Sequence, residues 1–185
     1  MTTILLVTRA CHRAAQWHAG QRRKGVAAEP YVNHLAEVAA LVAEATGGSD
    51  PNLIAAAMLH DAIEDAGVTH AEIADHFNPD VADLVAEVTD DKALDKHVRK
   101  ALQVEMAPKK SDRAKAIKLA DKTSNLRALA ASPPADWDLA TKAAYLDWAR
   151  RVVAGLRGTN AWLEAEFDAA AAEVERVLEA ELRDD

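Results

Sequence analysis

Apolar residues recur along this chain every three to four positions, which is the spacing of one face of an α-helix. There is no sustained alternation typical of strands, no internal repeat and no linker. Six predicted helices have both ends defined, at about residues 4–24, 34–46, 78–89, 112–131, 136–157 and 160–183. Three more are predicted with one end defined: a helix that begins at residue 51 and carries AMLHDAIEDAG at 57–67, a short helix that begins at 69, and a helix that ends near 106. We therefore expect an all-α, single-domain bundle of about eight to ten helices over residues 1–185.

Several of the predicted helices carry recognisable signals at their ends. Asp50 followed by Pro51 is typical of an N-cap and first helical position, and THAE at 69–72 fits a capping box. Gly25, which follows the basic cluster QRRK, is expected to cap the first helix. The helix over 112–131 has an amphipathic pattern and is expected to stop before Pro133.

The composition favours a helical protein and argues against a general nucleic-acid binder. Half of the 185 residues are apolar but only 4% are aromatic, and alanine and leucine, which favour helices, dominate the apolar share. The 30 acidic and 22 basic residues give a formal charge of −8, which repels a nucleic-acid backbone. An anionic ligand would therefore have to bind at a local basic patch.

The sequence contains no sign of a membrane segment or of cysteine chemistry. The apolar run in MTTILLV is too short for a signal peptide, and no stretch approaches the roughly 20 apolar residues that span a bilayer. We therefore expect a cytoplasmic protein without nucleic-acid or membrane partners. Cys11 is the single cysteine, so neither an internal disulfide nor a cysteine-based zinc site is expected.

The segment AMLHDAIEDAG places four ionisable side chains in an apolar stretch that is suited to burial. These are His60, Asp61, Glu64 and Asp65. Burying unpaired charges costs several kcal/mol or more, and a metal ion is the simplest partner for such a group. On a continuous helix, His60 would stack on Glu64 and Asp61 on Asp65, because each pair is four residues apart.

Two further residues could complete a metal site, namely His34 in PYVNH and Asp121 in the apolar run IKLADKTSNL. Alternatively, His34 is a surface or helix-start residue, and Asp121 pairs with Lys118 or Arg127. The full set would supply two imidazoles and two carboxylates from His34, His60, Asp61 and Asp121. With positions left open for water and substrate, such a set suits Mn²⁺ or Fe²⁺.

Other histidines and basic residues have simpler interpretations. We expect solvated or helix-capping roles for His18, His70, His76 and His97, and a solvated charged face for Arg22, Arg99 and Lys100.

Seven segments in order along nearly the whole chain carry a resemblance to a known family. They are HAGQRRKG, EPYVNH, LHDAIEDAGVT, VAEVTDDKAL, RKALQVEMAP, KLADKTSNLRAL and GTNAWLE. The chain resembles the HD-superfamily hydrolase domain of the RelA/SpoT alarmone enzymes, and most closely the stand-alone small alarmone hydrolases, which include the metazoan SpoT homologue. The resemblance implies Mn²⁺ as the cofactor, bound by His34, His60, Asp61 and Asp121. It also implies that Glu64 and Asp65 position and activate the attacking water.

The resemblance further implies a set of substrate contacts and two departures from the family pattern. The contacts are Arg23, Lys24, Lys96, Asn125 and Tyr145. Thr141 stands where close relatives carry an arginine, which puts the substrate preference and the role of Tyr145 in question. Thr123 and Ser124 are smaller than the residues that relatives often have there, and this could reshape the nucleoside pocket.

The activity implied by the resemblance is hydrolysis of the 3′-diphosphate of guanosine 3′,5′-bispyrophosphate, (p)ppGpp, to pyrophosphate and GDP or GTP. A small-molecule nucleotide, ppGpp or pppGpp, is thus the expected partner, and the chain length favours a hydrolase without a synthetase domain. Two alternatives stay open. The site could act on another nucleotide such as NADPH, since a fold does not select the base. The chain could also be a non-catalytic alarmone-binding module.

Overall fold

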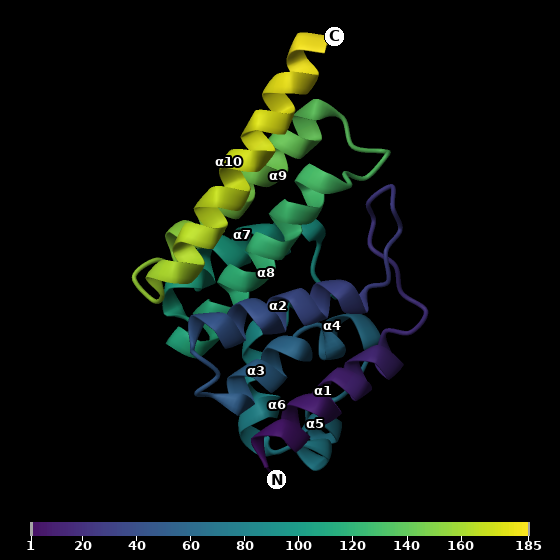
Figure 1. Cartoon of the computed structure of the whole chain (residues 1–185), viewed down its shortest axis with the longest axis vertical. Coiled ribbons are helices and arrows are strands. Elements are labelled where there is room, and N and C mark those ends of the chain that lie inside the picture. Colours follow the sequence, from purple (N-terminus) through teal and green to yellow (C-terminus); the bar gives the residue numbers. More distant parts are fainter. Residues whose placement is uncertain (1, 185) are drawn as a thin grey trace.

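The computed structural model describes residues 2–184, which form helices joined by loops (Figure 1). In chain order the helices are α1 (Thr3–Trp17), α2 (Val32–Ala45), α3 (Pro51–Met58), α4 (Ala62–Ala66), α5 (His70–His76), α6 (Pro79–Val88), α7 (Lys96–Met106), the 3₁₀ helix η1 (Ala107–Lys109), α8 (Asp112–Ala131), α9 (Leu139–Ala154) and α10 (Ala161–Asp184). No strand occurs within this range. The predicted all-α architecture is confirmed.

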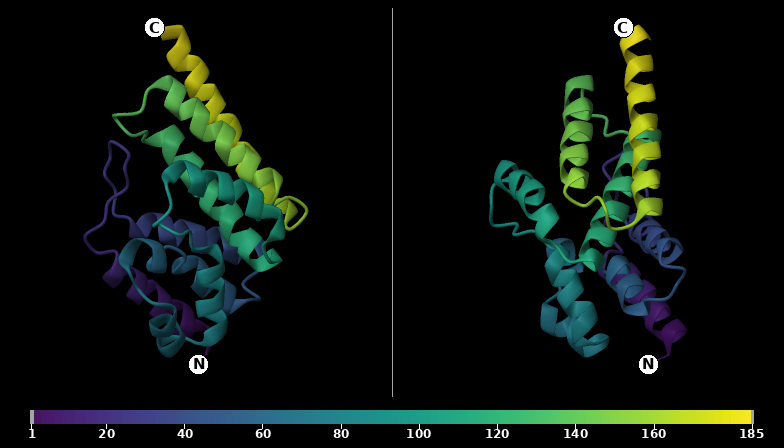
Figure 2. Two further views of the ribbon diagram at one scale, coloured as in Figure 1. Left: turned by 180° about the vertical axis from the view of Figure 1, so that it is seen from behind. Right: turned by 90° about the vertical axis from the view of Figure 1, so that its left-hand side faces the viewer.

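Helix α8 is the central element of the fold. It packs against α10, α2, α6 and α9, and it carries the polypeptide through the middle of the molecule (Figure 2). Every residue from Ala116 to Ser124 is buried, so the helix is covered on all sides there. The amphipathic pattern predicted for α8 is therefore wrong over its middle turns, and three charged residues, Lys118, Asp121 and Lys122, lie in the interior.

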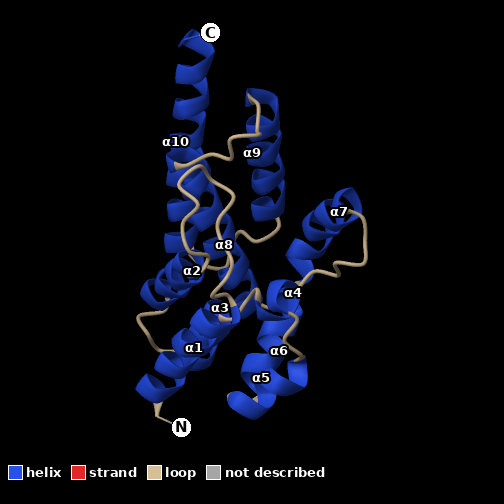
Figure 3. Cartoon of the chain, turned by 90° about the vertical axis from the view of Figure 1, so that its right-hand side faces the viewer, coloured by secondary structure: helices blue, strands red, loops and turns tan. Residues whose placement is uncertain are grey.

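The other helices form two groups around α8. Helices α9 and α10 extend together at one end of the molecule, whereas α1, α3, α5 and α6 lie at the other end (Figure 3). Helix α7 contains no buried residue and packs mainly against α9. The apolar core continues from the lower group through α2 and α8 to α10, and the most completely buried large side chains include Leu35, Ile73, Ile117 and Phe167.

Helix ends with strong local signals lie where they were predicted. The Asp50 side chain accepts a hydrogen bond from the backbone N–H of Leu53 at 3.0 Å, and α3 begins at Pro51. Thr69 and Glu72 form the predicted capping box at the start of α5. These side chains satisfy backbone donors that a helix cannot satisfy by itself. Their positions could therefore be predicted from local chemistry alone.

The first helix is shorter than predicted, because it ends at Trp17 and not near residue 24. Backbone hydrogen bonds between the two arms of the 18–31 loop replace helical ones. Arg23 N–H donates to Glu29 at 2.9 Å, and Tyr31 N–H donates to Gln21 at 3.1 Å. The basic cluster QRRK therefore belongs to this loop, and the prediction that Gly25 caps a helix is wrong.

The segment AMLHDAIEDAG does not form the continuous helix that was predicted. Helix α3 ends at Met58, and α4 begins at Ala62, so His60 and Asp61 lie in the turn between them. His60 Nδ1 lies 2.8 Å from the carbonyl oxygen of Ala57, which in a continuous helix would accept from the N–H of Asp61. His60 therefore lies outside the helix that carries Glu64, contrary to the predicted stacking of that pair. Asp61 and Asp65 do lie one helical turn apart, because the Asp65 N–H donates to the Asp61 carbonyl oxygen at 2.8 Å.

No helix among the described residues is long and apolar enough to cross a membrane. The single-domain organisation over residues 1–185 and the cytoplasmic location stay predictions.

Candidate active site

Four side chains converge where α2, the α3–α4 turn and α8 meet. His34 Nε2 lies 3.4 Å from Asp121 Oδ1 and 3.8 Å from Asp61 Oδ2. His60 Nε2 lies 3.1 Å from Asp61 Oδ2 and 3.9 Å from Asp121 Oδ1. One ligand atom from each of His34, His60 and Asp121 falls within 4.8 Å of the others. The structure thus brings together all four predicted ligand residues.

The chemistry of this cluster fits a bound cation. His60 is 5% exposed, and its Nε2 has no hydrogen-bond partner among the described residues. Its Nδ1 faces the carbonyl oxygen of Ala57, which can only accept, so Nδ1 carries the hydrogen. In a neutral ring, Nε2 then presents a lone pair to the Asp61 carboxylate. Two acceptors at that distance repel each other unless a cation, either a proton or a metal ion, lies with them.

The ionisation of the cluster follows from burial and from its internal charges. Burial alone would lower the pKa of His60, but the carboxylates of Asp61 and Asp121 outweigh it and raise the pKa to about 9. Burial lowers the pKa of His34, against the opposing effect of Asp121. Burial would raise the pKa of both carboxyl groups, yet the surrounding cations hold both pKa values well below the usual range. A metal ion bound here would have to displace the proton on His60.

Asp121 is held in place by two residues on its own helix. Lys122 Nζ lies 2.9 Å from Asp121 Oδ2, and Asn125 Nδ2 donates to Asp121 Oδ1 at 2.6 Å. Burial would lower the pKa of Lys122, but Asp121 raises it, so this lysine stays charged in the interior. Lys118 and Arg127 lie near other carboxylates. The alternative in which Asp121 pairs with Lys118 or Arg127 is therefore wrong.

Tyr31 is a site residue that the sequence prediction missed. Its hydroxyl donates to Asp61 Oδ2 at 2.7 Å and lies 3.4 Å from Asp65 Oδ2. Burial and the Asp61 carboxylate raise its pKa, so it remains a donor. Its ring stacks on His18, which is 2% exposed and contacts Gln21 at 2.7 Å. His18 occupies the C-cap position of α1, so the predicted capping role agrees with the structure, whereas a solvated His18 does not. The sequence feature that could have identified Tyr31 as a site residue is its position three residues before His34.

Glu64 and Asp65 on α4 lie beside the cluster and line the adjoining cavity. Glu64 Oε2 accepts from the backbone N–H of Asp90 at 3.3 Å, and its Oε1 lies 3.5 Å from Arg99 Nη1. Burial, then the carboxylates of Asp90 and Asp61, raise the pKa of Glu64. Asp65 pairs with Lys92 at the surface of the cavity.

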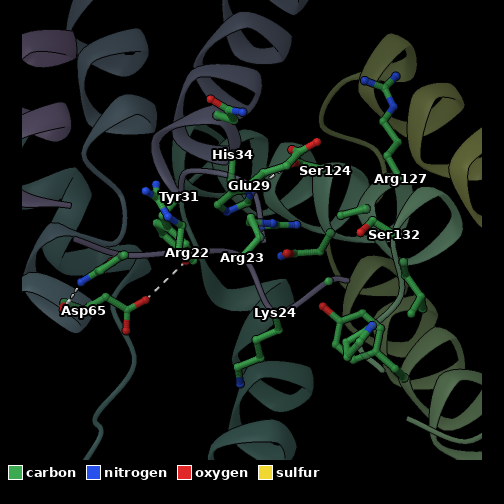
Figure 4. A pocket seen from close by; sticks show the side chains of 18 of the residues that line it. Arg22, Arg23, Lys24, Glu29, Tyr31, His34, Asp65, Ser124, Arg127 and Ser132 are labelled. Carbon is green, nitrogen blue, oxygen red and sulfur yellow. Dashed lines mark hydrogen bonds between the residues drawn. The ribbon is translucent and has the colours of Figure 1, made fainter. Parts of the chain in front are cut away.

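The cavity has a volume of about 860 Å³ and opens beside the cluster that contains His34 (Figure 4). The five predicted substrate-contacting residues all line it, namely Arg23, Lys24, Lys96, Asn125 and Tyr145. So do Arg22, Arg99 and Lys100, for which a solvated charged face was predicted; Arg22 is exposed, whereas Arg99 and Lys100 are half-buried. The Tyr145 ring packs against Trp137, with ring centres 5.3 Å apart. The cavity thus combines many cations with one aromatic wall.

The two departures from the family pattern have different outcomes. Thr141 is exposed near the start of α9, where its backbone N–H donates to Asp138 at 2.7 Å, and the described cavity lining does not include it. Ser124 does line the cavity, whereas Thr123 is fully buried and donates to the carbonyl oxygen of Leu119 at 2.8 Å. Of the three substituted positions, only Ser124 reaches the cavity.

A close backbone approach anchors the loop that carries Arg23 and Lys24. The backbone N–H of Ala27 donates to Ser132 Oγ at 2.9 Å, just beyond α8. A Cβ atom at Gly25 would lie 2.0 Å from the carbonyl oxygen of Ser132, a distance that no side chain can adopt. Gly25 is therefore required where the loop crosses this segment.

Replacing Gly25 by alanine is expected to lower the free energy of unfolding by about 1–3 kcal/mol, because the loop or the end of α8 must move. Thermal denaturation followed by circular dichroism measures the change. Gly20→Ala is the matched control, since nothing lies within 4 Å of a Cβ there. Equal melting temperatures for the two variants would contradict the close approach.

Comparisons with known proteins agree with this geometry. The family model described as the HD domain matches residues 10–152. The guanosine-3′,5′-bis(diphosphate) 3′-pyrophosphohydrolase MESH1 of Xenopus tropicalis is 46% identical over 163 residues, which cover 88% of this chain and 91% of that protein. Human MESH1 is 47% identical over 151 residues, covering 82% and 84%. A solved structure of a metazoan orthologue of SpoT that hydrolyses ppGpp superposes with a TM-score of 0.86 at 44% identity, covering 89% of this chain and 93% of that one.

Proposed function

The chain belongs to the HD domain family, and we propose that it is a hydrolase that removes the 3′-diphosphate of guanosine 3′,5′-bispyrophosphate. The products are pyrophosphate and GDP from ppGpp, or GTP from pppGpp. The observation that carries the proposal is the four-residue cluster of His34, His60, Asp61 and Asp121 beside a cation-lined cavity. The relatives named as 3′-pyrophosphohydrolases, which match most of the chain, support the same reaction.

An HD domain implies a divalent metal, and we propose Mn²⁺ bound by His34, His60, Asp61 and Asp121. Two imidazole nitrogens and two carboxylates form a mixed donor set that suits this ion, and the unpartnered Nε2 of His60 supports such a role. When bound, the metal supplies Lewis-acid polarisation of the phosphate and lowers the pKa of coordinated water.

Glu64 and Asp65 are the proposed proton-handling residues. The raised pKa of Glu64 suits a group that accepts a proton during the reaction, because efficient general bases have a pKa near the working pH. Asp65 shares the hydroxyl of Tyr31 with Asp61, so the tyrosine can orient both carboxylates. In this proposal Glu64 removes the proton from the attacking water and Asp65 holds that water in place.

The proposed substrate contacts divide between phosphate and nucleoside. Arg23, Lys24 and Lys96 bring positive charge to the cavity of a chain whose overall charge is −8, and such a local patch attracts a polyphosphate. A guanidinium can also bind two phosphate oxygens at once. Tyr145, packed against Trp137, offers an aromatic wall for a purine ring. The cavity volume of about 860 Å³ lies within the range of small-molecule sites.

Two alternatives stay predictions, namely activity on another nucleotide such as NADPH and a non-catalytic binding role. The first rested on the fact that a fold does not select the base, and Thr141, which added support to it, lies outside the described cavity lining. The second is disfavoured because the proposed site retains all of its ligand and proton-handling residues, namely His34, His60, Asp61, Glu64, Asp65 and Asp121. A competition assay across nucleotides would separate the first from the proposed reaction.

Removal of metal is expected to abolish turnover of ppGpp. Purified protein would be incubated with ppGpp, with and without EDTA, and the products separated by anion-exchange chromatography. We expect GDP and pyrophosphate in the presence of Mn²⁺, no product with EDTA, and recovery when Mn²⁺ is added in excess. Unchanged product in EDTA would contradict the metal-dependent mechanism, and absence of conversion with Mn²⁺ would contradict the reaction.

A further inference from the structure

A chain of polar side chains connects His34 to the C-terminal helix. His34 Nδ1 lies 2.8 Å from Ser124 Oγ, and Ser124 Oγ lies 2.6 Å from Glu37 Oε2. Arg127 Nη1 donates to Glu37 Oε1 at 3.0 Å, and Arg127 Nη2 pairs with Glu166 of α10. The series of contacts therefore crosses between α2 and α8 three times before it reaches α10. His34, Ser124 and Arg127 lie along one side of the cavity (Figure 4).

The direction of each hydrogen bond in this chain follows from the donors that are present. A carboxylate that pairs with a guanidinium accepts on both oxygens, so Glu37 accepts from Arg127 and from Ser124. A serine hydroxyl has one hydrogen, which is then directed at Glu37. Ser124 Oγ can therefore only accept from His34, and Nδ1 of His34 must carry its hydrogen. In a neutral ring this leaves the lone pair on Nε2, the nitrogen that faces Asp61 and Asp121.

We propose that Ser124 and Glu37 are positioning residues that fix the tautomer and ring orientation of His34 for metal binding. This inference rests on the metal role of His34 in the proposed function. Histidine ligands commonly donate their second ring N–H to a carboxylate or carbonyl, and here a hydroxyl connects the ring to the carboxylate. His60 receives the equivalent support from the carbonyl of Ala57.

The two histidines therefore differ in how substitution can affect them. The partner of His60 is a backbone carbonyl, which no substitution removes. The partners of His34 are side chains, and the buried Ser124 is 1% exposed, so water does not readily replace its hydroxyl. Arg127 and Glu166 extend the support to α10 by fixing the second oxygen of Glu37.

Titration of the metal-free protein with MnCl₂ by isothermal calorimetry tests the proposal. Ser124→Ala is expected to weaken Mn²⁺ binding by about 10–100-fold, the usual effect of removing the partner of a ligand histidine. Glu37→Gln is expected to weaken it in the same direction, because an amide can also donate to Ser124 and so reverse the hydrogen bond to His34. Glu44→Gln, at an exposed position two turns further along the same helix, removes an equal charge and should leave the affinity unchanged.

The tautomer of His34 is a second measurement, which a merely structural role would not change. Two-bond ¹H–¹⁵N correlation spectra of the metal-free protein distinguish a ring protonated on Nδ1 from one protonated on Nε2. We expect the Nδ1–H form of His34 in the parent and in Glu44→Gln, and a growing share of the Nε2–H form in Ser124→Ala and Glu37→Gln. A resonance assignment by His34→Gln identifies the ring.

The possible outcomes separate this inference from the proposed function. Parent-like affinity and tautomer in a folded Ser124→Ala protein overturn the positioning role. If that variant does not fold, the same result in Glu37→Gln overturns it, since Glu37 lies at the cavity surface. A parent protein that binds no Mn²⁺ removes the metal site and this inference together. If Mn²⁺ binding depends on Ser124 but the protein does not hydrolyse ppGpp, the inference is supported and the proposed reaction is contradicted.

Discussion

Replacing His60 by alanine is expected to lower kcat/KM for ppGpp by about 10³-fold or more while the protein remains folded. A metal in such a site contributes several kcal/mol to transition-state stabilisation, and each ~1.4 kcal/mol corresponds to a factor of ten. The substitution removes the Nε2 atom that faces Asp61 and Asp121. Without His60, Asp61 keeps the hydroxyl of Tyr31 and Asp121 keeps Lys122 and Asn125, so neither carboxylate is left buried without a partner.

The measurement combines activity, metal content and folding. Initial rates of GDP release give kcat/KM, mass spectrometry of the desalted protein gives bound manganese, and circular dichroism gives the fold. His12→Ala on the exposed side of α1 is the matched control, and it should behave as the parent does. Full activity in His60→Ala with unchanged metal content would exclude His60 as a ligand.

His60 is a better choice for this experiment than Asp121, because the two residues differ in their surroundings. Asp121 is paired with Lys122, which is 4% exposed. Removal of one partner of a buried pair typically costs 3–5 kcal/mol, since the other charge stays buried alone. Loss of activity in Asp121→Ala would therefore mix ligand loss with unfolding.

The parts of the fold that could be predicted from sequence depend on interactions between near neighbours. The capping box at Thr69 and the Asp50–Pro51 start of α3 involve partners within three residues. The end of α1 could not be predicted in this way, because the loop after Trp17 is held by hydrogen bonds to residues 29–31 and to Ser132. Such partners become neighbours only when the chain folds.

The residues of the candidate site also divide into those that could be predicted from the sequence and those that depend on the fold. His60 and Asp121 could be selected because polar residues in apolar segments need partners, and the family resemblance supported His34 in PYVNH as a further ligand. The turn at His60 could not be predicted, because there the carbonyl oxygen of Ala57 accepts from the His60 ring and not from a helical backbone N–H. Tyr31 was missed because a tyrosine at a helix start is consistent with many roles, and only the fold shows its hydroxyl at Asp61.

Replacing Glu64 by glutamine is expected to lower kcat by about 10²–10⁴-fold, the usual contribution of a general acid or base. Because glutamine keeps the shape and the hydrogen bond from the backbone N–H of Asp90, metal affinity should change little. Loss of activity with unchanged metal affinity would distinguish Glu64 from the proposed metal ligands, because loss of a ligand removes metal and activity together. Loss of Mn²⁺ binding in Glu64→Gln, measured by calorimetry, would instead assign Glu64 to the metal cluster.

The pH profile gives the sharper test of the same role. Glu64 must be ionised to accept a proton, so kcat/KM should fall on the acid side as its carboxylate is protonated. Asp90 and Asp61 raise the pKa of Glu64, whereas Lys118 lowers it and Arg99 lies 3.5 Å from its Oε1. Asp90→Asn removes a charge that raises this pKa, and it should therefore move the acid limb of the profile to lower pH. An unmoved limb, or a limb that persists in Glu64→Gln, would mean that another group accepts the proton.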